Sequence, residues 1–143
     1  MISQNELKKI ILEYLSQNKL MSLATSSDDN PWASTVFFAY DDNLNFYFLT
    51  EPGTRKAENI EKNPRVSATI NEEWGGGGKV KGIQLEGEAS ETEDQGEIKI
   101  FLKRHHWARD YITGSKIFKV IPKKIIYLDD EKFGPGGKEE LLL

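Results

Sequence analysis

The chain has 143 residues, of which 38% are hydrophobic and 29% are charged, a composition that predicts one globular domain over residues 1–143. Its formal net charge is −4 and its sequence pI is about 5.3, which excludes a globally basic surface for nucleic acid. It has no cysteine, which excludes disulfides, thiolate metal sites and a cysteine nucleophile, and fits a reducing compartment.

The first segment, MISQNELKKIILEYL, predicts a helix rather than a targeting signal. Charges separate its apolar residues, so it lacks the continuous apolar core of a signal peptide. Ser3 and Glu6 fit a capping box, and apolar residues then recur at helical spacing until near Asn18. No segment of the chain approaches the ~18 continuous apolar residues of a membrane span, so we expect a soluble cytoplasmic protein.

From Leu20 the period of the apolar residues changes to two, which predicts strands. Turn residues separate three of them, at Leu20–Ser26, Trp32–Tyr40 and Leu44–Thr50. The third is apolar or aromatic on both faces, which is typical of a strand between two layers or inside a barrel.

Two helices and four strands are predicted in the remainder. The helices span about 54–62 and about 93–105, and the strands span 65–71, 80–91, 116–122 and 123–129. Gly82 and Gly87 within the long strand indicate a bulge, a bend or close backbone approach. We expect the tail FGPGGKEELLL to be mostly irregular.

This order predicts a mostly β (α+β) fold. Antiparallel hairpins dominate and no run of βαβ units occurs, so the simplest closure is a small antiparallel barrel of six to seven strands with helices packed outside it.

Three motifs are weaker than they first look. WGGGGKV lacks the earlier glycine and the Ser/Thr of a phosphate-binding P-loop, which leaves a plain mobile loop. His105 and His106 are adjacent and cannot share a helix face, so we expect no metal site there. The acidic run Asp129-Asp130-Glu131 is expected to be solvated surface in a turn.

The segment LTEPGTRKAENIEKNP carries the strongest functional signal. Cations are unexpected at a helix N-terminus, which is the positive end of the helix dipole, yet Arg55 and Lys56 open this helix. Free backbone N–H groups, hydroxyls of Thr50 and Thr54, and two cations together predict an anion site, with phosphate as the natural ligand. The alternative is local pairing of Arg55 with Glu58 or Asn59, with Lys56 in solvent.

The aromatic strands WASTVFF and FYFLT would place flat apolar surface and small hydroxyls around this anion site. That combination suits a planar cofactor with a phosphate tail. A simple barrel core explains the phenylalanines equally well and explains Ser34 and Thr35 less well.

The run from Trp32 to Asn71, followed by a tryptophan and GIQLEGEA, resembles the FMN-binding split β-barrel superfamily, whose best-known member is pyridoxamine-phosphate oxidase. The resemblance covers about residues 5 to 130. It implies a split barrel with Greek-key-like closure and a homodimer that binds two FMN molecules between its subunits. The details look most like a small group of bacterial proteins rather than the oxidase itself.

The resemblance also implies roles for individual residues. Arg55 and Lys56 match the phosphate-binding basic pair, and Thr50 and Thr54 match the hydroxyls beside it. The strand whose backbone follows the edge of the flavin corresponds to Ala33, Ser34 and Thr35. Gln84 lies on the strand that approaches from the other subunit, in a register two positions from the oxidase pattern, and Trp107 is a candidate for stacking near the ring.

The departures from the family pattern narrow the function. The oxidases carry a C-terminal arginine-containing substrate motif, whereas this chain has no arginine after Arg109, which argues against oxidation of vitamin B6. No catalytic acid or base can be named, as expected where the flavin carries the redox step. The leading hypothesis is an FMN-dependent oxidoreductase or flavin reductase acting on a small molecule.

Two rival hypotheses remain open. The first is a non-catalytic flavin, deazaflavin or haem carrier or sensor on the same barrel, for which His105 and His106 are the candidate histidine ligands. The second is an RNA-binding barrel, against which the acidic charge balance argues.

Overall fold

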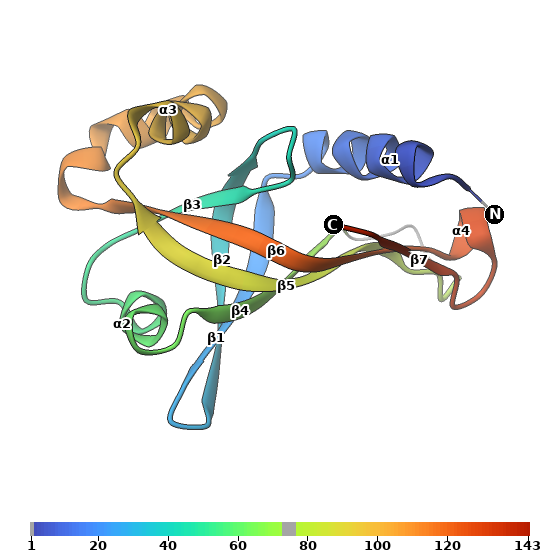
Figure 1. Cartoon of the computed structure of the whole chain (residues 1–143), viewed down its shortest axis with the longest axis horizontal. Helices are drawn as coiled ribbons and strands as arrows, with labels where there is room; N and C mark the ends of the chain where they lie inside the picture. The colour runs from blue at the N-terminus through green and yellow to red at the C-terminus, as the bar shows by residue number, and fades with distance from the viewer. Residues whose placement is uncertain (1, 73–76) are drawn as a thin grey trace.

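The computed structural model describes residues 2–72 and 77–143. Its seven strands form one antiparallel sheet in the order β3-β2-β1-β4-β5-β6-β7, and β3 also pairs with β6. That extra pairing closes six strands into a barrel and leaves β7 as an added strand (Figure 1). The predicted antiparallel barrel of six to seven strands with flanking helices is therefore confirmed.

As far as residue 104, the helices and strands follow the predicted chain order. The strands are β1 (Leu20–Ser27), β2 (Asn30–Tyr40), β3 (Phe46–Thr50), β4 (Arg65–Asn71), β5 (Lys81–Thr92), β6 (Lys116–Asp129) and β7 (Lys138–Leu141). The α-helices are α1 (Gln4–Ser16), α2 (Arg55–Lys62), α3 (Gln95–Arg104) and α4 (Asp130–Phe133), and two 3-10 helices, η1 (His106–Asp110) and η2 (Ile112–Gly114), follow α3. No helix within the described part of the chain is long and apolar enough to span a bilayer.

The barrel interior is filled by alternate side chains of the strands. In β4 every second residue is buried, as expected for a strand with one face toward the core. β3 is buried on both faces because its inner residues Phe46 and Phe48 fill the barrel while Tyr47 lies under α3 with Phe101. The two-sided apolar pattern of this strand thus reflects a second, smaller core outside the barrel.

Helix α3 is anchored at both ends by charged side chains. Near its start, the Glu97 carboxylate accepts hydrogen bonds from Tyr47, Thr92 and Lys119. In its last turn, the Arg104 guanidinium donates to the Leu15 carbonyl at 2.8 Å and also to the Asn18 carbonyl, both at the end of α1. These contacts fix the direction in which the chain leaves α3 toward η1.

The hairpin of β1 and β2 extends beyond the barrel, at the bottom of the view in Figure 1. Its two loop residues, Asp28 and Asp29, have φ values of 51° and 63°. Positive φ at both central residues is the mark of a type I′ turn, whose twist matches that of the flanking strands. The projecting hairpin presents Trp32 beside the start of α2.

Three expectations about the second half of the chain are wrong, and the first concerns its strands. The strands predicted at 116–122 and 123–129 are one continuous strand, β6, because a bulge opposite Glu86 and Gly87 accommodates Pro122 within the ladder. Residue 87 must be a glycine because the backbones of β5 and β6 approach closely there: a Cβ at Gly87 would lie 2.3 Å from the Ile121 carbonyl oxygen.

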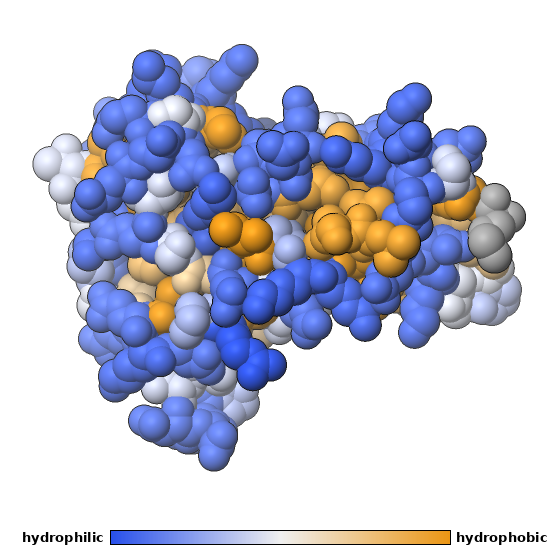
Figure 2. Space-filling model, viewed as in Figure 1, coloured by the Kyte–Doolittle hydropathy of each residue, from blue (hydrophilic) through white to orange (hydrophobic). Residues whose placement is uncertain are grey.

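The tail is also more regular than predicted, because β7 pairs with residues Ile125–Leu128 of β6. Asp129 is buried rather than solvated, since its carboxylate accepts hydrogen bonds from the Tyr127 hydroxyl and the Lys132 amide. Beyond β7, Leu142 and Leu143 are exposed and share a shallow cavity with Ile121, and Figure 2 shows apolar surface where the chain ends. The predicted glycine loop lies partly outside the described residues.

Candidate cofactor site

The turn between β3 and α2 brings two hydroxyls together. Pro52 and Gly53 form the turn, and Gly53 has a φ of 83°, a conformation that glycine adopts without penalty. The side-chain oxygens of Thr50 and Thr54 consequently lie 3.0 Å apart. Thr54 is the N-cap of α2, and its hydroxyl accepts a hydrogen bond from the Ala57 amide. The predicted helix start is therefore confirmed.

A cavity of about 430 Å³ opens beside these hydroxyls, and we call it the lysine cavity. Its walls come from the end of β3, the start of α2 and the segment after α3, and its lining residues are Leu49, Thr50, Glu51, Thr54, Lys56, Trp107, Tyr111 and Ser115. Four of the predicted site residues thus share one cavity. The sequence analysis did not predict Tyr111 and Ser115 as site residues, because only the fold brings their segment to the cavity. The one sequence feature that could have pointed to them is an aromatic residue, Tyr111, in a polar stretch.

Arg55 does not line the lysine cavity, and its side chain lies over an aromatic ring. Its guanidinium carbon lies 4.3 Å from the centroid of the Trp32 ring. The alternative prediction of local pairing is wrong: Asn59 donates its amide to the Thr25 hydroxyl, and Arg55 forms no ion pair or hydrogen bond within residues 2–72 and 77–143. Arg55 and Lys56 therefore flank the α2 N-terminus as two cations without acidic partners in the described structure.

A row of aromatic rings supports one wall of the lysine cavity. Trp107 lies 4.9 Å from Phe37 and 6.2 Å from Tyr111, measured between ring centroids. Trp107 and Tyr111 are 44% and 58% exposed, so both can meet a ligand. Flat apolar surface therefore lies beside a cation and two hydroxyls in this cavity.

His105 packs beneath this row of rings and is not part of its exposed surface. It is buried, and its Nε2–H donates to the Phe38 carbonyl over 2.7 Å. Burial lowers the pKa of His105, and the positive charges of Arg104 and Lys19 act in the same direction, while the Phe38 hydrogen bond opposes them. The ring is neutral at pH 7 and has one nitrogen committed to the backbone, whereas His106 is exposed.

A second cavity, of about 320 Å³, lies on the outer face of the sheet. It joins Ala33 of β2 to Gln84 of β5 across β1 and β4, and its other lining residues are Ser22, Leu23, Ala24, Ser67, Ala68, Thr69 and Leu85. Thr35 is exposed opposite Ser22, and Ser34 is half-buried opposite Leu23. This outer face carries small side chains, which leaves room for an approaching surface.

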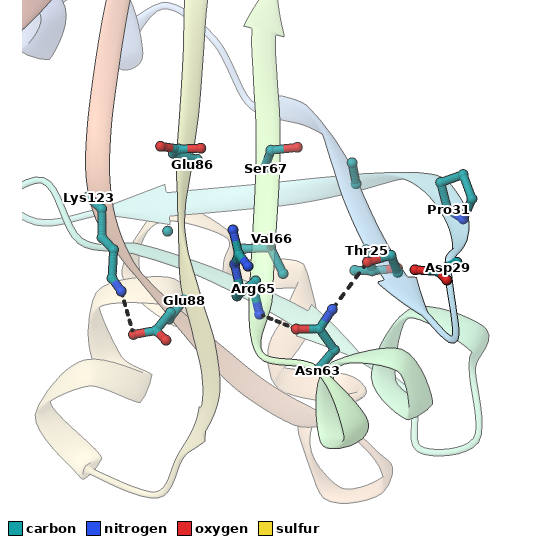
Figure 3. A pocket seen from close by; sticks show the side chains of 13 residues that line it. Thr25, Asp29, Pro31, Asn63, Arg65, Val66, Ser67, Glu86, Glu88 and Lys123 are labelled. Carbon is teal, nitrogen blue, oxygen red and sulfur yellow. Dashed lines mark hydrogen bonds and ion pairs between the residues drawn. The ribbon is translucent and has the colours of Figure 1, made fainter.

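A third cavity, of about 820 Å³, lies beside the projecting hairpin (Figure 3). It contains an ion pair of 3.3 Å between Lys123 and Glu88 and a hydrogen bond from the Asn63 amide to the Ser26 hydroxyl. None of the predicted site residues lines it. It shares Ala24 and Ser67 with the second cavity and so extends the same outer face.

Comparison with known proteins identifies relatives of the whole barrel. A family model described as pyridoxamine 5′-phosphate oxidase matches residues 7–129. The UPF0306 protein of Photorhabdus laumondii is 33% identical over 88 residues, and the matched part spans 61% of this chain and 62% of that protein, less than two thirds of its length. The UPF0306 protein of Yersinia enterocolitica is 30% identical over 103 residues, covering 71% of this chain and 68% of that protein.

Solved structures share the fold at low identity. General Stress Protein 26 of Bacillus anthracis has a TM-score of 0.74 and 24% identity, with 96% of this chain and 98% of that chain covered. A FAD-binding protein of Mesorhizobium loti has a TM-score of 0.69 and 22% identity, covering 87% and 90%. A heme binding protein of Mycobacterium smegmatis has a TM-score of 0.78 and 17% identity, covering 98% and 58%. At these identities the likeness establishes the fold alone.

Proposed function

Because this chain belongs to the pyridoxamine 5′-phosphate oxidase family, we propose that it is an FMN-binding oxidoreductase or flavin reductase that acts on a small molecule. The observation that carries the proposal is the lysine cavity. It places Lys56, Thr50 and Thr54 beside the N-terminus of α2, where free N–H groups and the helix dipole favour an anion.

The residues present fit the parts of FMN. The phosphate would take hydrogen bonds from the Thr50 and Thr54 hydroxyls, a charge from Lys56, and the bidentate edge of Arg55. Trp107 offers an exposed ring for the planar isoalloxazine. Bound FMN would supply the redox chemistry, and the chain would bind and orient it and exclude water.

We also propose that the protein is a cytoplasmic homodimer with the cofactor at the subunit interface. The outer sheet face supports this, because Ala33 and Gln84 line a cavity there whose walls are small side chains. Gel filtration and analytical ultracentrifugation of the purified protein test the dimer directly.

The absorbance spectrum of the purified protein tests the cofactor. We expect flavin bands, with about one FMN per chain after reconstitution with excess FMN, and quenching of the flavin fluorescence on binding. Oxidation of NADH or NADPH by the loaded protein would support the reductase activity. Absence of both co-elution and quenching would refute FMN binding.

The second candidate is a non-catalytic flavin, deazaflavin or haem carrier or sensor. It is favoured by the likeness in fold to a FAD-binding protein and to a heme binding protein. Bound FMN without any oxidation of reduced nicotinamide would support a carrier. A Soret band after addition of haem that disappears in His106→Ala would support haem, since His106 is the exposed histidine.

A further inference from the structure

We propose that Trp32 is a positioning residue that holds Arg55 for the phosphate of the bound flavin. The inference rests on the proposed function and extends it to a residue of the projecting hairpin. The observation behind it is the stacking of the Arg55 guanidinium over the indole ring at 4.3 Å.

The geometry of the stack leaves the recognition edge of the arginine free. A guanidinium is planar, and its N–H groups point outward within its plane. The guanidinium carbon lies over the indole ring at 4.3 Å from its centroid, and this contact with the π face provides no hydrogen-bond acceptor for the N–H donors. Arg55 also donates to no protein acceptor within residues 2–72 and 77–143. A phosphate can therefore take two parallel hydrogen bonds while the stack persists.

The stack also restricts the rotamers of the Arg55 side chain before any ligand binds. Arg55 is exposed and begins a helix, so without Trp32 its long side chain would sample many rotamers. Holding the guanidinium at the start of α2, next to Lys56 in sequence, means that less entropy is lost when the phosphate arrives. Trp32 is available for this role because it is 43% exposed at the hairpin end of β2.

A merely structural role for Trp32 makes a different prediction. Trp32 pairs across the ladder with Thr25, which accepts a hydrogen bond from Asn59 of α2. If Trp32 only supported this packing, its loss would weaken every ligand of the barrel equally. If it positions Arg55, its loss would weaken only ligands that carry a phosphate.

The experiment is a double-mutant cycle with two ligands, FMN and riboflavin, which differ by the phosphate. Dissociation constants are measured by flavin fluorescence for the wild type, Trp32→Leu, Arg55→Ala and the double variant, with circular dichroism to confirm folding. We expect Trp32→Leu to weaken FMN binding by about two- to fivefold, the range for a cation–π contact at an exposed site, and to leave riboflavin unchanged. Trp32→Phe keeps an aromatic face and should retain most of the FMN affinity.

In the Arg55→Ala background, Trp32→Leu should have no further effect on FMN, because the arginine it positions is gone. Provided that the wild type binds FMN, three results would each overturn the inference. They are an equal loss of affinity for FMN and riboflavin, a loss of FMN affinity from Trp32→Leu that is as large in the Arg55→Ala background as in the wild type, and tighter FMN binding by Trp32→Leu. A wild type that binds neither flavin would overturn the proposed function, and the role of Trp32 with it.

Discussion

The hydroxyls of Thr50 and Thr54 lie 3.0 Å apart, although one residue ends a strand and the other caps a helix. Each hydroxyl has one hydrogen and two acceptor lone pairs. Thr54 donates its hydrogen to the Glu51 carbonyl over 3.0 Å, and rotation away from that carbonyl would free it for an anion. Thr50 is buried, which limits competition from water at that position. The end of β3 and the start of α2 thus contribute two neighbouring hydroxyls to the cavity that Lys56 also lines.

The first prediction separates the phosphate contacts from the ring contacts. Lys56→Met should weaken FMN binding by about 10- to 100-fold, because a hydrogen bond to a charged group contributes about 1.5–3 kcal/mol. Thr50→Val keeps the shape and should cost about two- to tenfold. Titration of each variant with FMN and with riboflavin measures these losses, and the affinity for riboflavin should not change. Lys62→Met, at the opposite end of α2, is the matched control, and an equal loss there would contradict the assignment.

The second prediction concerns Gly53. A Cβ there would meet nothing within 4 Å, so any effect of Gly53→Ala must come from its φ of 83°. Left-handed backbone costs a non-glycine residue about 1–2 kcal/mol, and we expect that loss in urea unfolding together with weaker FMN binding. Gly114 also has open space around it but lacks a positive φ, so Gly114→Ala should change neither quantity.

The third prediction is a pH dependence that originates in His105. The pKa of His105 is lower in the folded protein than in the unfolded chain, where it is about 6.5. Between these two pKa values the unfolded chain therefore binds more protons than the folded protein. This contribution to stability is complete above about pH 6.5 and is lost as the pH falls toward the folded pKa. Chemical unfolding between pH 7 and pH 5 should show the decline in the wild type and in His106→Gln, and His105→Gln should flatten it. Equal slopes in all three proteins would contradict this account.

The fourth prediction concerns the contact between α3 and α1. Arg104→Met should lower the free energy of unfolding by about 1–3 kcal/mol, because the carbonyls of Leu15 and Asn18 lose a charged donor. The neighbouring Lys103 is exposed and contacts neither carbonyl, so Lys103→Met should have little effect. If the two variants unfold at the same urea concentration, the arginine does not stabilise this junction.

Local signals predicted most of the fold. The helix α2 was predicted because its cap, its short apolar face and the following Asn63-Pro64 lie within one stretch of sequence. β4 was predicted to the residue, since strict alternation reports burial on one face. β6 was split in two because Pro122 reads as a strand end, and only the partner strand reveals the bulge that tolerates it. β7 is short and charged, and it becomes a strand through pairing with β6.

The same distinction applies to the site. Thr50, Thr54 and Lys56 lie within seven consecutive residues, so their chemistry was visible as a motif. Tyr111 and Ser115 join them from a distant segment, and no local pattern reports that proximity, whereas the strand that begins with Trp32 was predicted to lie near the site. The contact of Arg55 with the Trp32 ring could not be predicted either, because it depends on how the hairpin is placed beside α2.

The contacts of α1 bear on the order in which the protein folds during synthesis. Gln4 donates to the Glu140 carbonyl and accepts from the Leu142 amide, Tyr14 donates to the Lys81 carbonyl, and Arg104 binds the end of the same helix. These partners all follow α1 in the chain, so α1 is fully held only after they have been synthesised. Until β7 is synthesised, the apolar face of α1 lacks the part of its cover that Leu141 provides, and exposed apolar surface of this kind favours aggregation of a nascent chain.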